Sequence, residues 1–423
     1  MLWWKNLTDV CRRWREIIFA SPRFLDLQLK CTGRTPTRRS LDIWPPFPIA
    51  ISEYRSELDD KGQDNIIAAL EHHDRVIQIH LESFEIFPAE TFSALSQKPF
   101  PVLTRLNLKT YDNIAQVLGE QFLGGSTPCL QHFCLHNIAF PTFPKLALSC
   151  SSLSFFTLSE IPIAGYISPE VMATCLATLP NLRYLFIRFQ SPRSRPDRIG
   201  LPPPTRVVLP ALGHFEFKGV SEYLEDLVAR IDTPKLVRLK IQLFMDLMFN
   251  IPQLSKFIDR AERIRPLNPA KIEFFSLSIE IDLGGVVNLK FLCEEPDRQA
   301  SLMAQVCSQL SPLLSHVEQL HICEVTPGNA RRGNGIDPMQ FLELFHPFPA
   351  MQYLCISGEL RPLVARALQE LTGDVATEVL PSLRRLVFEG FSPPGPIQKD
   401  IQGFITARQN SNHPVDVEWK PWP

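Results

Sequence analysis

The sequence predicts an α/β solenoid of about a dozen strand–turn–helix units rather than a single compact domain. Three observations lead to this prediction. The chain has 423 residues, more than one hydrophobic core usually serves. Its 38 prolines make up about 9% of the residues, against a usual share near 5%. Many of these prolines precede the same short apolar pattern, which recurs from one end of the chain to the other.

The repeated pattern is a proline, one further residue and then apolar-x-x-apolar-x-apolar. Clear copies begin at Pro101, Pro128, Pro180, Pro210, Pro234 and Pro381. Copies without the proline run from Leu153 to Leu158 and from Met351 to Ile356, and weaker copies end at Leu81, Leu277 and Ile322. Clear neighbours lie roughly 23 to 30 residues apart, and the spacing lengthens to over 30 towards the C-terminus. This brackets and exceeds the period of leucine-rich repeats.

Each copy has a direct physical interpretation. The last two apolar positions alternate with polar ones, which predicts a short strand with one buried face. The proline ends the preceding helix, and helix-start signals such as Ser168-Pro169-Glu170 and Ser221-Glu222 fall between the strands. We therefore expect an irregular leucine-rich-repeat solenoid, a horseshoe with a parallel sheet on its concave face and helices on its convex face. The alternative is a compact α/β domain with a similar rhythm.

Composition narrows the classes of partner and compartment. The formal charge of -2 provides no field that would draw the chain to nucleic acid. The absence of a long apolar run or a signal peptide predicts no membrane association. The ten cysteines include no CxxC pair, as expected of reduced thiols in the cytoplasm or nucleus.

No catalytic, cofactor-binding or metal site is predicted, so we do not expect an enzyme. The chain has neither a Gly-x-Ser-x-Gly elbow nor a phosphate-binding loop. Cys129, His132, Cys134 and His136 offer metal-ligating side chains. On a strand, however, the two histidines would stand about 14 Å apart, too far for one zinc ion.

A protein-binding surface follows from the repeat geometry, because residues between the buried strand positions must point to the concave face. The predicted substrate-binding residues are Arg105, Asn107, Lys109, Tyr184, Phe186, Arg188, His214, Glu216, Lys218, Arg238, Lys240, Gln242, Tyr353 and Cys355. Exposed tyrosine and phenylalanine beside arginine are typical of protein interfaces. Long side chains that merely cover the sheet are the alternative interpretation.

The N-terminal segment from residue 7 to 24 predicts an amphipathic helix. Its apolar residues at helical spacing are Leu7, Val10, Cys11, Trp14, Ile17 and Ile18. From the pattern alone, this is either an ordinary capping helix, with Trp14 in the core of the first repeat, or a docking helix for another protein.

The same segment resembles the second half of an F-box, whose Val-Cys-Arg-x-Trp signature it matches at Val10, Cys11, Arg12 and Trp14. The rest of the chain is similar to fungal F-box proteins with irregular leucine-rich repeats. The resemblance implies an N-terminally truncated F-box, because the Leu-Pro helix that begins a full F-box has no counterpart here. It also implies three segments: a partial F-box at 1–24, a junction at 25–60 and the repeats at 61–423.

The resemblance further implies a substrate-recognition subunit of a Skp–cullin–F-box ubiquitin ligase, a monomer within a hetero-complex. Its partners would be a Skp-type adaptor and a target protein of unknown identity. The residues implied to face the adaptor are Leu7, Val10, Cys11, Arg12, Trp14 and Ile18. The alternative is a leucine-rich-repeat protein-binding scaffold without any link to a ligase.

Overall fold

The structure is a computed structural model, and it is α/β, with a large, mostly parallel array of strands alternating with helices. It describes residues 9–20, 25–34, 37–54, 59–192, 205–244, 250–265, 267–325, 339–371, 375–390 and 395–420. The chain divides into two compact units. Unit 1 comprises Met1–Glu216 with Arg230–Thr233, and unit 2 comprises Phe217–Ala229 with Pro234–Pro423. Each unit is described by itself.

The strands of unit 1 follow one another in the sheet in chain order. They are β1 (Leu27–Lys30), β2 (Ile49–Tyr54), β3 (Val76–Ser83), β4 (Arg105–Thr110), β6 (His132–His136), β8 (Phe155–Ile161), β9 (Tyr184–Phe189) and β11 (His214–Gly219), of which residues up to Glu216 belong to unit 1. The pairs from β1 to β9 are parallel. Parallel neighbours in chain order are consistent with the predicted leucine-rich-repeat solenoid. The sheet already begins at Leu27, so the first two strands lie within the predicted junction 25–60.

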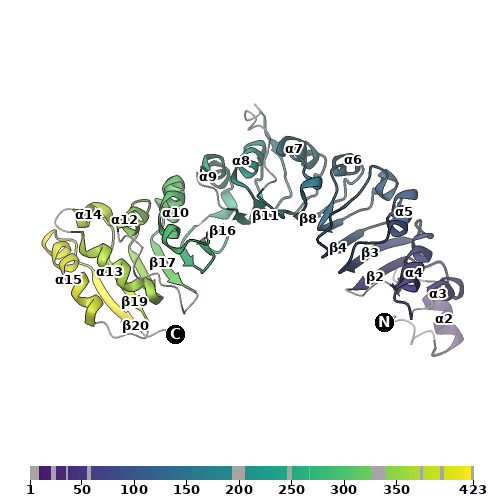
Figure 1. Ribbon diagram of the computed structural model, residues 1–423, viewed down its shortest axis with the longest axis horizontal. Coiled ribbons are helices and arrows are strands. Elements are labelled where there is room, and N and C mark those ends of the chain that lie inside the picture. Colours follow the sequence, from purple (N-terminus) through teal and green to yellow (C-terminus); the bar gives the residue numbers. More distant parts are fainter. Residues whose placement is uncertain are drawn as a thin grey trace. The chain divides into compact units, whose positions relative to one another are not determined.

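The helices of unit 1 lie along one face of its strands (Figure 1). They are α2 (Arg12–Phe19), α3 (Thr37–Ile43), α4 (Asp60–Leu70), α5 (Ala89–Gln97), α6 (Phe143–Ala147) and α7 (Pro169–Ala177), with short 3-10 turns η2 (Phe122–Gly125) and η3 (Ile163–Gly165). The predicted start of α7 is confirmed: the hydroxyl of Ser168 accepts a hydrogen bond from the Val171 amide, and Pro169 is the first helical residue. Two short parallel pairs, β5 (Gln116–Val117) with β7 (Ile138–Ala139) and β10 (Val207–Val208) with β12 (Ile231–Asp232), complete unit 1.

The repeated pattern places the strands as predicted. In β4, Leu106, Leu108 and Thr110 are fully buried, whereas Arg105, the first residue of the strand, is exposed. In the coils that follow, buried aromatic side chains pack on one another. Phe143 of α6 stacks on Phe156 of β8 with ring centroids 4.3 Å apart. The alternation of apolar and polar residues in the sequence thus gives each strand one buried face and one open face.

Unit 2 departs from the predicted all-parallel sheet. Its strands stand in the order β13 (Arg238–Leu243), β16 (Val287–Leu292), β15 (Ser278–Leu283), β14 (Ala270–Phe274), β17 (Gln319–Glu324), β18 (Tyr353–Ser357), β19 (Arg385–Glu389) and β20 (Asp416–Lys420). Strand β15 is antiparallel to both of its neighbours, β14 and β16, whereas the pairs β13–β16, β14–β17, β17–β18, β18–β19 and β19–β20 are parallel. The expectation of one strand per helix was therefore wrong between residues 270 and 292.

The antiparallel hairpin has a local cause. Gly284 and Gly285 adopt φ values of 62° and 70°, the left-handed region that a tight hairpin turn requires. The Asp282 carboxylate accepts a hydrogen bond from the Gly285 amide at 2.8 Å, which closes the turn. Leu277, where the sequence placed the end of a strand, is instead 60% exposed in the turn between β14 and β15.

The helices of unit 2 are α8 (Ser221–Arg230), of which residues up to Ala229 belong to this unit, α9 (Pro252–Arg260), α10 (Pro296–Gln309), α11 (Ser311–Leu314), α12 (Met339–Phe345), α13 (Arg361–Gln369), α14 (Val375–Val379) and α15 (Gly395–Asn410), with 3-10 turns η4 (Glu262–Ile264) and η6 (Gly358–Leu360). The start of α8 at Ser221 matches the predicted signal.

Buried turn carbonyls are capped by different side chains in different coils, not by one repeated asparagine. Arg75 donates to the Phe47 carbonyl from both Nε and Nη2, at 3.0 and 2.8 Å. In unit 2, Gln299 donates from Nε2 to the carbonyls of Phe275 and Cys293, each at 3.0 Å. Side chains of different kinds thus satisfy the carbonyl groups of these turns.

The thiols provide a first testable prediction. All ten cysteines are free, but only Cys11 and Cys129 are exposed. Burial raises the pKa of Cys31 to about 12 and that of Cys134 to about 11, which removes the reactive thiolate. We expect iodoacetamide at pH 8 to alkylate Cys11 and Cys129 in the folded chain and the remaining thiols only after denaturation, as read by peptide mass spectrometry. Rapid labelling of Cys134 in the native chain would contradict the structure.

Candidate functional site

The face of the unit 1 sheet opposite its helices carries most of the predicted binding residues, and we call it the open face. Arg105 and Tyr184 are exposed here, and the remaining predicted residues of this unit are half-buried: Asn107, Lys109, Phe186, Arg188, His214 and Glu216. They alternate with fully buried residues such as Leu106 and Leu185. The structure therefore brings these side chains to one surface, as the alternation predicts.

A row of four rings crosses the open face from strand to strand, and we call it the ring ladder: His132, Phe155, Tyr184 and His214. His132 stacks on Phe155 with centroids 4.1 Å apart and planes at 5°. Phe155 lies 5.6 Å from Tyr184, which stacks on His214 at 4.6 Å. Strand register produces the row, because Arg105, His132, Phe155 and Tyr184 are successive partners across β4, β6, β8 and β9.

Two members of the ring ladder, His132 and Phe155, are not among the binding residues that the sequence predicts. A signal was present, because Phe155 precedes the buried Phe156 as Arg105 precedes Leu106 and Tyr184 precedes Leu185. The same repeat position therefore faces outward in each case.

Two carboxylates of the open face, those of Glu216 and Glu82, accept hydrogen bonds from neighbouring side chains. Arg188 forms an ion pair with Glu216 through Nη2. The Tyr111 hydroxyl donates to the Glu82 carboxylate at 2.6 Å. By contrast, no carboxylate of the described residues lies within ion-pair distance of Arg105 or Lys109. The positive charges of Arg105 and Lys109 are therefore not balanced by an ion pair.

Three histidines of the face, His80, His132 and His136, have lowered pKa values. Burial lowers the pKa of His132, and the nearby Arg105 guanidinium lowers it further. Burial also lowers the pKa of His80 and of His136. The His136 ring is hydrogen-bonded to the Ser159 hydroxyl at 3.0 Å. Since the ordinary pKa of histidine is already about 6.5, these rings are neutral at pH 7.

A hollow of about 370 Å³ lies on the open face beside the ring ladder. Its lining includes Ser52, Gln78, His80, Arg105, Asn107 and His132. The Asn107 amide is hydrogen-bonded to the His80 ring at 3.1 Å, and the Asn107 Oδ1 atom is buried without a hydrogen-bond partner. Amide, hydroxyl and guanidinium groups thus converge on this hollow, while none of its described lining residues is acidic.

In unit 2, the predicted residues also emerge between buried strand positions, with one exception. Arg238 and Lys240 are exposed, Lys218, Gln242 and Tyr353 are half-buried, and the Lys218 ammonium lies 5.7 Å from the Phe244 ring. Cys355 was expected on the surface but is only 2% exposed. The Cys355 thiol hydrogen-bonds with the side chains of Tyr353 and Glu389, and its burial raises its pKa to about 12.

The N-terminal helix is shorter than predicted. Helix α2 spans Arg12–Phe19, Val10 lies in the turn before it, and Leu7 lies outside the described residues. Arg12 forms an exposed ion pair with Glu16 at 3.0 Å, Cys11 is exposed and Ile18 is half-buried.

One face of α2 is anchored and the other is open to solvent. Phe19 contacts Trp44 and Phe47, with ring centroids 6.2 and 5.6 Å apart. Trp14 and Ile17, three residues apart and so on one helix face, are 47% and 58% exposed. Phe19 lies about 200° further round the helix than Ile17, nearly opposite. Of the two alternatives for Trp14, the position in the core of a capping helix does not hold.

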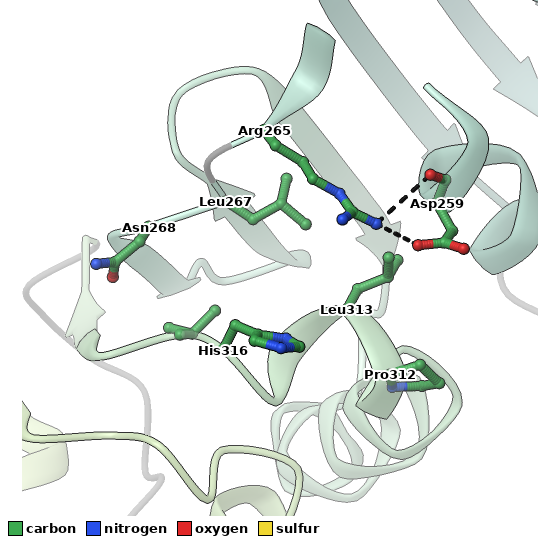
Figure 2. A pocket seen from close by; sticks show the side chains of 8 residues that line it. Asp259, Arg265, Leu267, Asn268, Pro312, Leu313 and His316 are labelled. Atoms are coloured by element: carbon green, nitrogen blue, oxygen red, sulfur yellow. Dashed lines mark hydrogen bonds and ion pairs between the residues drawn. The ribbon is translucent and has the colours of Figure 1, made fainter. Parts of the chain in front are cut away.

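A second hollow lies in unit 2, and several of its polar groups are already paired (Figure 2). It measures about 470 Å³ and is lined by residues that include Asp259, Arg265, Asn268 and His316. Figure 2 shows Arg265 reaching across to Asp259, with which it forms an ion pair. Asn268 accepts a hydrogen bond from the Gln319 amide at 3.1 Å. Because these polar groups are engaged with one another and with the backbone, this hollow is a weaker candidate for a binding site than the hollow on the open face.

Within the described part of the chain, no cluster of three histidine, cysteine, aspartate or glutamate side chains could hold a metal ion. None of the described helices is both long and apolar enough to cross a membrane.

Comparison with known proteins identifies no family. No family model matches the chain, and no curated protein is detectably similar in sequence. Among solved structures, the crystal structure of a TLR13–ssRNA13 complex is similar with a TM-score of 0.37 and 12% sequence identity, over 93% of this chain and 49% of that chain. This chain thus spans about half the length of that neighbour. A likeness this distant assigns neither a family nor a ligand.

Proposed function

We propose that this chain is the substrate-recognition subunit of a Skp–cullin–F-box type ubiquitin ligase. Helix α2 docks on the Skp-type adaptor, and the open face holds the protein to be modified. The observation that carries this proposal is the solvent-facing Trp14 and Ile17 pair on a helix that is anchored from its opposite side. An exposed tryptophan on a fixed helix is the kind of side chain that anchors protein interfaces.

Two further features support the proposal. The residues around Trp14 resemble the second half of an F-box, in which these helix positions face the adaptor. The chain also presents a long row of outward side chains in each unit, and such rows suit the binding of another protein rather than catalysis. Holding a target near a ligase requires these two surfaces and no chemistry within the chain itself.

The proposal is tested by measuring binding of the full chain to a purified Skp-type adaptor by calorimetry. We expect Trp14→Ala to weaken this binding at least thirtyfold, because truncating a central interface tryptophan costs about 2 kcal/mol or more. Circular dichroism should be unchanged, since Trp14 is not part of the core. Ile163→Ala is the matched control, because Ile163 is similarly exposed, at 57%, but lies in η3.

Failure of the unaltered chain to bind, or equal binding by the Trp14→Ala variant, would contradict the ligase proposal. The chain would then be a protein-binding scaffold that uses the open face alone.

A further inference from the structure

The hollow beside Arg105 and the ring ladder form one strip across the open face of unit 1. Arg105 pairs in register with His132, which begins the ladder that ends at His214. Neighbouring strands lie about 4.8 Å apart, so the strip spans roughly 19 Å over five strands. An extended peptide of about six residues has this length.

The charge of the strip favours a single anionic group at one end. Arg105 lines the hollow with the neutral donors of Gln78 and Ser52, and no described lining residue is acidic. The Glu82 and Glu216 carboxylates on this face accept hydrogen bonds from Tyr111 and Arg188. One guanidinium among neutral donors matches the charge of one carboxylate better than that of a dianionic phosphate.

The rings present their edges, not their faces, to an incoming molecule. The face of His132 is covered by Phe155, and that of Tyr184 by His214, because the rings stack along the row of strands. Ring edges carry the positive end of the aromatic quadrupole and offer apolar carbon to a neighbour. Such edges suit aliphatic and acidic side chains, whereas the stacking of nucleic-acid bases requires free ring faces.

We propose that this strip binds an extended acidic segment of a partner protein, with an aspartate or glutamate side chain in the hollow beside Arg105 and apolar side chains along the ring ladder. This inference rests on the proposed role of the open face in holding a target. Nucleic acid fits less well, because Lys30, Arg105 and Lys109 are three unpaired cations among the described residues of the face, and tight phosphate binding draws on about six to ten.

The test uses the full chain and fluorescein-labelled peptides of eight residues. Each peptide carries glutamate near one end, followed by leucine, valine or phenylalanine at alternate positions, and has a twin with glutamine in place of glutamate. Anisotropy should show at least tenfold tighter binding of the glutamate peptides. Arg105→Gln should abolish this preference, whereas Tyr184→Ala should weaken both twins alike.

The matched control is Arg238→Gln. Arg238 occupies the same first position of its strand, β13, as Arg105 does in β4, but lies in unit 2. We expect this variant to keep the full preference for glutamate. A labelled oligouridylate of eight nucleotides forms a further arm, and tighter binding of this probe, lost in Arg105→Gln, would overturn the inference in favour of nucleic acid. Equal binding of the peptide twins, no binding of either, or a preference that survives Arg105→Gln would also overturn it.

The two proposals fail independently. Trp14→Ala should leave peptide binding unchanged, and Arg105→Gln should leave adaptor binding unchanged. A chain that prefers the glutamate peptides but ignores the adaptor overturns the ligase proposal alone. A chain that binds the adaptor without preferring these peptides overturns the acidic-segment proposal alone.

Discussion

Phe156→Ala should destabilise unit 1 by about 3–5 kcal/mol, the usual cost of removing a fully buried phenylalanine. The Phe156 side chain is 0% exposed and stacks on Phe143 at 4.3 Å, while Phe133 lies 5.9 Å away. Removing one ring leaves a cavity that these neighbours cannot fill without leaving their own contacts. Urea unfolding followed by circular dichroism measures the loss as a lower transition midpoint.

The adjacent residue of the same strand provides the control. Phe155 points to the open face and is only half-buried, so Phe155→Ala should cost clearly less. Phe156→Leu, which retains most of the apolar volume, should fall between the two. Equal losses from Phe155→Ala and Phe156→Ala would show that β8 does not present alternate residues to the core and to the open face.

This alternation is the part of the fold that sequence could predict. The strands β4, β6, β9, β11, β13 and β19 begin four residues after the repeated prolines, as the pattern of Pro101 and its copies indicates. The prediction succeeds because a strand with one buried face leaves a period-two record in its own residues. No distant contact has to be known.

Most of the features that the sequence did not predict depend on residues far apart in the chain. One of them, a hairpin, has a local turn signal that does not fit the repeated pattern. The ring ladder joins His132, Phe155 and Tyr184 from three coils, and only the register of the strands makes them neighbours. Cys355 is buried by the longer side chains beside it, which its own position in the pattern does not reveal. The antiparallel β15, by contrast, was signalled locally by Gly284-Gly285 between alternating segments.

The candidate binding sites could also be predicted only in part from the sequence. The outward positions in β4, β9 and β11 follow from the pattern, but their electrostatics do not. That Glu216 is engaged by Arg188 whereas Arg105 has no acidic partner among the described residues is a matter of side-chain geometry between strands. At the N-terminus, the pattern permitted both a core and a surface position for Trp14. The contact of Phe19 with Trp44 and Phe47, residues of the next coil, decides between them.

Arg408→Met should cost about 2–5 kcal/mol, because two buried carbonyls lose their hydrogen-bond donor together. Arg408, in the last turns of α15, is 1% exposed, and its guanidinium donates from Nη1 to the Leu380 carbonyl at 2.6 Å and from Nη2 to the Leu383 carbonyl at 2.7 Å. These carbonyls belong to the turn that leads into β19. The Arg408 side chain therefore links α15 to the turn before β19 through two hydrogen bonds.

Two substitutions separate the hydrogen bonds from the volume of the Arg408 side chain. Arg408→Lys retains a donor but not the planar fork that reaches both carbonyls, so we expect an intermediate loss. Hydrogen–deuterium exchange should locate the effect, with faster exchange in α15 and β19 and no change in the strands of unit 1, because repeat units chiefly stabilise their neighbours. If Arg408→Met were as stable as the unaltered chain, the two carbonyls would have another donor, and the coils would not depend on individual side chains to satisfy their turns.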